Sequence, residues 1–369
     1  MIIKNRKFKR LIPFLCAMFL VCILAGCDVE DTKVIPEESV SIDRDMNVES
    51  VTEEVAVETI DPTETVEAVT ELPTETPVTM SPTEEPIETL IPSSSTFSIR
   101  FIDVGQADAA LIECDGHYML IDGGNRNDSD KMYTILRNNE IKTLDLLVGT
   151  HPDEDHIGGL AGALNYANAI ITLCSTKSHD TKVFSDFNKY AEKNGGGIQI
   201  PNPGDQYNLG SAQVTILAVN SGSEPNDSSI VIKIVYGETS FLFTGDAEAE
   251  AEQWLLNSGY DLSADVLKVG HHGSSSSTSK RFLNAVNPTY GIISTGKDNT
   301  YGHPTEETLN HLRNAGVQIY RTDLQGDIFV SSDGKTVSIT TQKNISEDNL
   351  SSFVALIVWL TWEIKYEPI

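Results

Sequence analysis

Residues 151–159 read HPDEDHIGG, a stretch that holds two histidines, three acids and two glycines. The apolar run LDLLVGT at 144–150 predicts a strand, so the motif begins on the loop where that strand ends. Pro152 stiffens this loop, while Gly158 and Gly159 allow the backbone to turn tightly into the segment that follows. The motif therefore predicts a strand, a stiff loop rich in metal-binding groups and a helix, in that order.

The imidazole and carboxylate groups of this motif are spaced so that they can meet. Groups two and four positions apart converge on one point once the loop curls. His151 and Asp153 can then face one metal ion, and Asp155 and His156 can face a second one. The alternative is an acidic surface loop in which the histidines are incidental.

Two later strands also end in metal-binding groups, which favours the metal site over the surface loop. The run FLFTGD at 241–246 ends in Asp246, and VLKVGHHGS at 266–274 ends in His271 and His272. Three separate strands that each deliver histidine or aspartate to their ends form a more specific pattern than any one of them alone.

From Phe97 to about residue 342 the chain alternates short apolar runs with amphipathic segments. Helices are predicted at 129–140, 182–194, 247–257, 278–286 and 305–315. Further strands are predicted at 170–174, 198–201, 213–218, 229–236, 240–244, 265–269, 289–294, 317–321, 327–331 and 336–340. Many of these strands follow one another directly, which favours an α/β sandwich with sheets inside and helices outside over a doubly wound sheet.

The set of motifs IDGG, THPDEDHIGG, LFTGD and LKVGHHGS resembles the metallo-β-lactamase superfamily. The stretches FIDVGQADAALIE, NDSSIVI, YGHPT and YRTDLQGDI are similar to the hydrolase domain of ComEC-type competence proteins, and the resemblance covers 97–342. It implies a four-layer αββα sandwich with a two-metal site in a shallow groove at the strand ends. Carried over by position, the metal ligands would be His151, Asp153, Asp155, His156, Asp246 and His271.

Within this set the resemblance gives Asp246 the bridging position and lets His271 complete the second site. Most members of the superfamily have histidine where Asp153 stands, and this harder oxygen ligand tilts the first site from Zn²⁺ toward Mn²⁺. Asn226 stands near the position where the superfamily usually has a further metal-binding histidine. The metal site that lacks this histidine would be completed by Asn226 or water, or it would be filled only with substrate. We therefore expect one or two divalent ions, Mn²⁺ or Zn²⁺.

Bound divalent ions would activate a water molecule and polarise the bond to be cleaved. Asp155 would orient this water and accept its proton. His303 would bind phosphate or protonate a leaving oxygen, or else it only holds a turn before a helix. His272 and Ser274 would bind phosphate oxygens, or they belong to a flexible polar loop.

These features predict a metal-dependent hydrolase of phosphodiester bonds in DNA or nucleotides. Hydrolysis of a small ester, lactone or lactam is the alternative enzymatic function, and a non-catalytic surface domain that binds a partner is the alternative of another class. The chain has 369 residues and a formal net charge of −28, which disfavours tight binding along an extended nucleic acid. The sequence indicates no protein partner.

The first residues are typical of a lipoprotein signal at 1–26. Five basic residues precede an apolar run at 11–24, which is too short to span a bilayer, and the segment ends before Cys27. Cys27 would carry the lipid and hold the protein at the extracytoplasmic face of the cell membrane, while the alternative is a plain membrane anchor.

Residues 27–96 are predicted to form a disordered linker rich in Thr, Glu and Pro. Nineteen acidic and two basic residues lie between 28 and 96, and such a segment buries too little apolar surface to fold. The tail at 343–369 has no role that we can assign. Cys114 and Cys174 either pair with each other or remain as two buried thiols.

Overall fold

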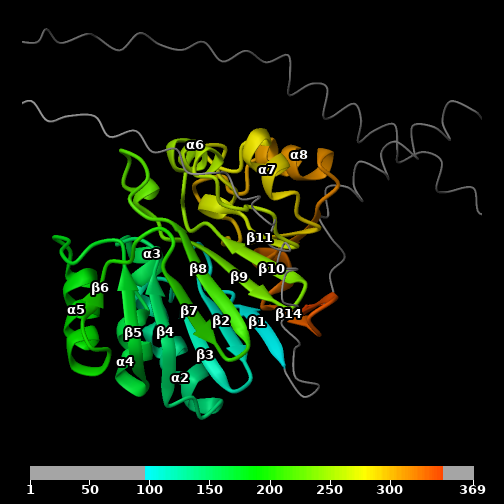
Figure 1. The fold of residues 1–369 in the computed structure, drawn as a ribbon. Coiled ribbons are helices and arrows are strands. Elements are labelled where there is room, and N and C mark those ends of the chain that lie inside the picture. The colour runs from blue at the N-terminus through cyan, green and yellow to red at the C-terminus, as the bar shows by residue number, and fades with distance from the viewer. Residues whose placement is uncertain (1–95, 344–369) are drawn as a thin grey trace, which may run out of the picture. The chain divides into compact units, whose positions relative to one another are not determined.

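The computed structural model describes residues 96–343. The predicted signal, the linker up to residue 95, the tail from residue 344 and, with them, Cys27 lie outside the described residues. The described part contains two sheets that face each other (Figure 1). Within it, no helix combines the length and apolarity needed to cross a membrane.

The first sheet has eight strands and contains the strand that leads into the HPDEDHIGG motif. Its strands in spatial order are β15 (Val337–Thr341), β14 (Ile328–Ser332), β1 (Phe97–Phe101), β2 (Ala110–Cys114), β3 (His117–Ile121), β4 (Thr143–Gly149), β5 (Asn168–Cys174) and β6 (Ile198–Gln199). β3 through β6 run parallel, and the other neighbours are antiparallel.

The second sheet has seven strands and contains the two other strands that end in aspartate or histidine. Its strands in spatial order are β13 (Gln318–Arg321), β12 (Tyr290–Ile293), β11 (Val266–Lys268), β10 (Thr239–Phe243), β9 (Val231–Tyr236), β8 (Ala212–Ala218) and β7 (Gln206–Leu209). β10 through β13 are parallel, while β7 through β10 are antiparallel.

Helices cover the outer face of each sheet, which completes four layers (Figure 1). The first sheet is covered by α2 (Ser129–Asn138), α3 (Glu154–Ile157), α4 (Leu160–Tyr166) and α5 (Lys182–Asn194), and the second by α6 (Ala249–Asn257), α7 (Lys280–Val286) and α8 (Glu306–Asn314). Short pieces complete the described chain: η1 (Arg126–Asp128), η2 (Asn226–Ser228), η3 (Gly270–Gly273) and α9 (Thr322–Gln325). The predicted two-sheet α/β sandwich is confirmed.

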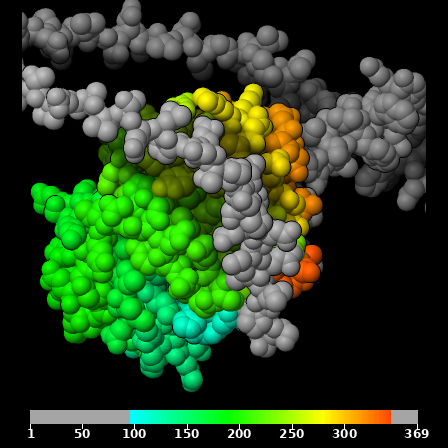
Figure 2. Space-filling model, viewed as in Figure 1, coloured from blue at the N-terminus to red at the C-terminus, as the bar shows by residue number. Residues whose placement is uncertain are grey.

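The central strands are apolar on both faces because both faces are buried. In β4, Leu146 and Val148 point into the core between the sheets, and Leu147 points into the core beneath the helices. The core between the sheets also contains stacked aromatic rings, with the Phe97 ring 4.7 Å from that of Phe241. In the space-filling view, residues coloured green cover most of this side, and the yellow and orange segments of α7 and α8 lie above them (Figure 2).

Candidate active site

The candidate site lies at one edge of the sandwich, where parallel strands from both sheets end. β4 leads into Thr150 and His151, β10 leads into Asp246, and β11 leads into the two neighbouring histidines of η3. A pocket of about 180 Å³ opens there. It is lined by Gln106, Asp153, Asp155, Asn226, Asp246, His271, His272, Tyr301 and His303. The shared edge thus brings together side chains that are far apart in the sequence.

Four side chains form a tight group whose ligand atoms all lie within 4.8 Å of one another: Asp155, His156, Asp246 and His272. His156 Nε2 is 3.3 Å from an Asp246 oxygen. His272 Nε2 is 3.3 Å from Asp155 Oδ2 and 3.5 Å from Asp246 Oδ2. Three of the six predicted ligands belong to this group, and the fourth member is a histidine that the sequence assigned to substrate binding.

The group fits a divalent cation because its buried polar atoms point at one another and lack other partners. Among the described residues, His156 Nε2, His272 Nε2 and Asp246 Oδ1 are buried without a hydrogen-bond partner, and His151 Nε2 beside them is too. Buried polar atoms in folded proteins are almost always satisfied. Imidazole nitrogens and carboxylate oxygens are also the donor set that Zn²⁺ and Mn²⁺ accept.

The electrostatics of the group point to a cation as well. Burial lowers the pKa of His272, but Asp246 and Asp108 outweigh it and raise that pKa to about 10. The pKa of His156 is likewise raised well above its ordinary value, against the effect of burial, by Asp246 and Asp122. The carboxylates thus leave an excess of negative charge that protons balance here, and a bound cation would take the place of these protons.

His151 and Asp153 lie at the side of this group. The His151 ring is 4.1 Å from that of His156, and its Nε2 is 3.7 Å from Asp153 Oδ2. Burial, together with the nearby His156, lowers the pKa of His151 to about 3, so its imidazole is neutral and can donate a lone pair. The Asp153 side chain is 42% exposed and forms part of the pocket wall outside the tight group of four.

The neighbouring histidines of η3 have different surroundings. The His272 side chain is buried, whereas that of His271 is 23% exposed and faces the pocket. His271 Nδ1 lies 2.9 Å from Glu248 Oε1, and its Nε2 lies 3.7 Å from Asp246 Oδ2. Of the two, His272 is the one whose nitrogen lies within the tight group, which the sequence did not predict.

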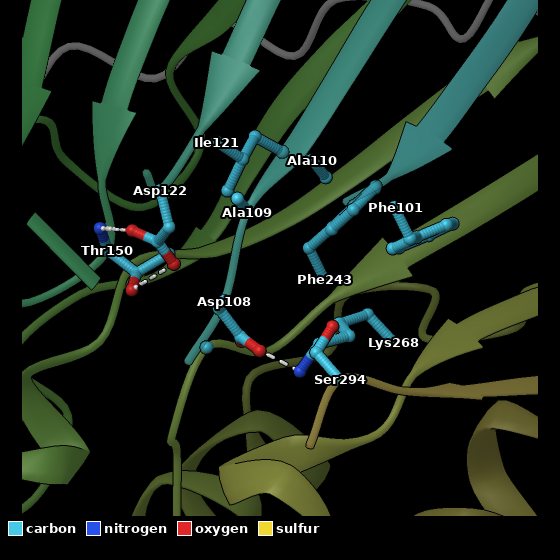
Figure 3. A pocket seen from close by; sticks show the side chains of 11 residues that line it. Phe101, Asp108, Ala109, Ala110, Ile121, Asp122, Thr150, Phe243, Lys268 and Ser294 are labelled. Carbon is cyan, nitrogen blue, oxygen red and sulfur yellow. Dashed lines mark hydrogen bonds and ion pairs between the residues drawn. The ribbon is translucent and has the colours of Figure 1, made fainter. Parts of the chain in front are cut away.

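The two histidines of the tight group are oriented by different buried partners behind them, an acid for His156 and a backbone carbonyl for His272. Asp122 Oδ2 lies 3.0 Å from His156 Nδ1, and the same carboxylate accepts hydrogen bonds from the Thr150 amide and hydroxyl (Figure 3). Asp122, the aspartate of the IDGG motif, thus supports His156 from behind. His272 Nδ1 donates to the Ser294 carbonyl at 3.0 Å, which leaves Nε2 to face the group.

Asp108 and Lys268 form a buried ion pair behind His272, and the sequence analysis did not single out Asp108. Lys268 Nζ is 2.7 Å from Asp108 Oδ2 (Figure 3), and Asp108 Oδ1 is 3.3 Å from His272 Nδ1. Burial would raise the pKa of Asp108, but Lys268 and His272 together hold it well below its usual range. Both side chains line a cavity of about 10 Å³ beneath the site. The lysine therefore offsets one of the negative charges at the base of the tight group, which is also called the metal group below because it fits a cation.

The NDSS stretch supports the site in three ways. The side-chain amide of Asn226 faces the pocket, and its Nδ2 donates to Glu248 Oε1 at 3.2 Å. Asp227 is buried and accepts the amide of Glu248 at 2.8 Å, which fixes the start of α6. The Ser229 hydroxyl lies 3.4 Å from His151 Nδ1 and accepts the Asp246 amide at 3.1 Å. Asn226 thus reaches the pocket but uses its amide to hold Glu248.

The remaining predicted residues divide between the pocket and its supporting loops. His303 lines the pocket, and its buried Nδ1 has no hydrogen-bond partner among the described residues. Burial and the nearby His271 lower its pKa, so the neutral ring prevails. Ser274 does not line the pocket. Its hydroxyl lies 2.8 Å from that of Ser276 and supports the loop. The two cysteines, Cys114 and Cys174, are free buried thiols.

Gly158 and Gly159 are required for a different reason than the tight turn expected from the sequence. Neither has a positive φ. A Cβ on Gly158 would lie 2.3 Å from the Arg126 amide nitrogen, and one on Gly159 would lie 2.0 Å from the Gly123 carbonyl oxygen. These glycines let two backbone segments touch, which holds the metal-binding loop against the loop after β3.

Comparison with known proteins gives a family. Residues 102–297 match the model of the metallo-beta-lactamase superfamily. ComE operon protein 3 of Bacillus subtilis is 32% identical over 260 residues, which cover 64% of this chain and 33% of that protein. Competence protein ComA of Neisseria gonorrhoeae is 30% identical over 226 residues, which cover 61% of this chain and 30% of that protein. The chain thus spans about a third of the length of these curated relatives.

Among solved structures, the metallo-beta-lactamase fold protein YhfI from Bacillus subtilis is similar to this chain at 12% sequence identity and a TM-score of 0.44. The superposition covers 64% of this chain and 100% of the YhfI chain. The family match extends over more than half of the chain and includes the residues of the tight group. The chain belongs to the metallo-β-lactamase superfamily, and its hydrolase domain is of the kind found in ComEC-type competence proteins.

Proposed function

We propose that the protein is a metal-dependent phosphodiesterase that cleaves DNA or nucleotides. The observation that carries this proposal is the convergence of buried, unpartnered histidine and aspartate atoms at the floor of an open pocket. A site built only for stability would satisfy these atoms internally. Here they meet at a point that both a cation and a substrate can reach.

Bound divalent ions would supply an activated water and polarise the bond to be cleaved. Asp155 accepts the proton of the attacking water, because its side chain is 33% exposed to the pocket and belongs to the tight group. Burial tends to raise the pKa of Asp155, but His156 and His272 outweigh it and keep the carboxylate ionised. His303, which also lines the pocket, donates a hydrogen bond to the leaving oxygen.

Gln106 adds a hydrogen-bond donor of fixed orientation to this pocket. Its Oε1 accepts from the Thr295 hydroxyl and from the Gly296 amide, each at 3.0 Å. Since a backbone N–H can only donate, the amide oxygen must point at Gly296 and the NH₂ group must point away from it. This NH₂ group is placed to bind a non-bridging oxygen of a phosphodiester.

The choice of a phosphodiester over a small ester or lactam rests on two further arguments. The pocket wall offers donors from Gln106 and His303, which suit the several oxygens of a phosphate. The names of similar proteins refer to competence and recombination, and this favours a nucleic acid substrate. We also propose, from the sequence alone, that Cys27 carries a lipid that holds the protein at the extracytoplasmic face of the cell membrane.

The test uses the mature full-length protein, stripped of metal and reloaded with Mn²⁺ or Zn²⁺. Its rates are measured on a single-stranded 12-mer, bis(4-nitrophenyl) phosphate, a lactone and a β-lactam. We expect cleavage of the phosphodiesters, and Asp246→Asn should lower it by more than about 100-fold. Asp261→Asn, at a 74% exposed side chain, is the matched control and should keep wild-type rates. Turnover of the lactone or lactam alone would refute the phosphodiesterase proposal.

A further inference from the structure

Tyr301 is the most exposed large apolar or aromatic side chain of the described residues, at 71%. It stands at the rim of the pocket that contains the metal group. A protein gains nothing in folding free energy from a tyrosine ring left in water, so packing within the domain does not explain its position. Its place at the mouth of the pocket points to a role in binding.

The loop that carries Tyr301 is tied down at both ends. The side-chain Nδ2 of Asn299 donates to the Gly296 carbonyl at 2.9 Å, and Asn299 Oδ1 accepts a hydrogen bond from the His303 backbone N–H at 3.0 Å. Gln106 Oε1 binds the Gly296 amide, which connects the start of the loop to the pocket wall. The ring is therefore presented on a loop braced by side-chain hydrogen bonds, so little conformational freedom is lost when a ligand binds.

A line of rings leads from the tight group to Tyr301, starting at His272, whose ring is 6.1 Å from that of His271. The His271 ring is 5.4 Å from that of His303, and the His303 ring is 5.8 Å from that of Tyr301 with 27° between their planes. One face of Tyr301 thus lies against His303, in a stacked arrangement. The exposure of its side chain leaves ring surface open to a planar ligand from solvent.

We propose that Tyr301 is a stacking platform for a nucleobase of single-stranded nucleic acid, next to a phosphodiester held at the metal group. This rests on the proposed phosphodiesterase function and names its substrate more closely. Stacking accepts any unpaired base, whereas the bases of a duplex are stacked on one another and hidden from the ring. The acidic charge of the chain supports this choice, because affinity must then come from stacking more than from binding a row of phosphates.

The experiment compares three 12-mers with phosphorothioate linkages, which slow cleavage, in the presence of Mn²⁺. One is a thymidine single strand, one is the same strand with abasic sites in place of bases, and one is a duplex. Fluorescence anisotropy gives their affinities for the wild-type protein, Tyr301→Ser and Tyr301→Phe. Phe329→Ser serves as the control, because Phe329 is an exposed aromatic residue outside the pocket.

We expect Tyr301→Ser to weaken binding of the thymidine strand about tenfold, while Tyr301→Phe and Phe329→Ser stay within about twofold of wild type. The abasic strand should bind the wild type and Tyr301→Ser equally weakly. A single strand with 2-aminopurine should lose fluorescence on binding the wild type but not Tyr301→Ser. That optical signal reports stacking and would not follow from a purely structural role for the ring.

Any of the following results would overturn the proposal. Tyr301→Ser binds the thymidine strand as the wild type does, or it loses the abasic strand to the same degree, which would place the ring against the sugar and phosphate. Failure of the wild type to bind any single strand also overturns it. Cleavage of single strands at equal kcat/KM by wild type and Tyr301→Ser would leave the phosphodiesterase standing and remove only the role of Tyr301.

Discussion

Replacing Lys268 by methionine tests whether the buried ion pair behind His272 supports the metal group. The Lys268 and Asp108 side chains are 4% and 6% exposed, and their charged atoms are 2.7 Å apart. Methionine keeps most of the volume of the lysine stem but removes the ammonium. The variant therefore leaves the buried Asp108 carboxylate without its cation, beside a histidine of the tight group.

The expected loss of stability is about 3–5 kcal/mol, the usual effect of removing one partner of a buried ion pair. The double variant Asp108→Asn with Lys268→Met removes both charges and should recover about 2 kcal/mol of this loss, because no buried charge then remains alone. Metal affinity should fall about 10–100-fold in the single variant, since the buried carboxylate beside His272 Nδ1 loses its cation and the surroundings of that histidine are disturbed.

Urea denaturation of the metal-free protein measures the first quantity, and calorimetric titration with Mn²⁺ measures the second. Lys233→Met is the matched control: Lys233 is also a buried lysine in a strand, but its partner Asp261 is 74% exposed and remote from the pocket. This control should cost about 0–1 kcal/mol and leave metal affinity unchanged. If Lys268→Met behaves like Lys233→Met in both measurements, the ion pair does not support the site.

Three further predictions concern the metal and the pH. Activity lost to a chelator should return better with Mn²⁺ than with Zn²⁺, and Asp153→His should shift the preference toward Zn²⁺; an unchanged ranking means that Asp153 does not bind the ion. His272→Ala should lower metal affinity by more than about 100-fold and His271→Ala by less than about tenfold, measured by calorimetry, and the reverse order would contradict the tight group. Burial raises the pKa of Glu252 from 4.5 to about 6, so the folded state binds this proton more tightly than the unfolded state does. About 2 kcal/mol of stability that is present below pH 4.5 is therefore lost as the pH rises through 6. Denaturation measured across this pH range should show a smaller loss of stability in Glu252→Gln than in the wild type.

The sequence predicted those elements whose signals are local. The helix predicted at 182–194 has the same bounds as α5, because the Thr181 hydroxyl accepts the Phe184 amide and gives the helix a defined start. The helix predicted from residue 278 begins at Lys280, after Ser279 caps it. The edge strand β7 (Gln206–Leu209) was missed, since an edge strand of four mostly polar residues has no apolar pattern to detect.

The site was predictable where a motif carries its own ligands and not where distant side chains meet. Asp155, His156 and Asp246 end or follow apolar strands, which is visible in the sequence. Asp108 and Lys268 are 160 positions apart in the sequence, and no local spacing of residues predicts their contact. Its only sequence signal is an acid that follows the Gly-Gln stretch directly before a strand.

The assignment of the neighbouring histidines depends on the backbone. His271 and His272 both adopt the left-handed region, with φ of 46° and 52°, which is costly for residues other than glycine. This bend places the buried His272 ring in the tight group and leaves His271 at the pocket wall beside Glu248. The sequence alone does not say which of two adjacent histidines faces the tight group. Here the strained turn decides that His272 does. The strained backbone thus lies directly at the tight group, where it sets which imidazole faces Asp246 and Asp155 from the buried side.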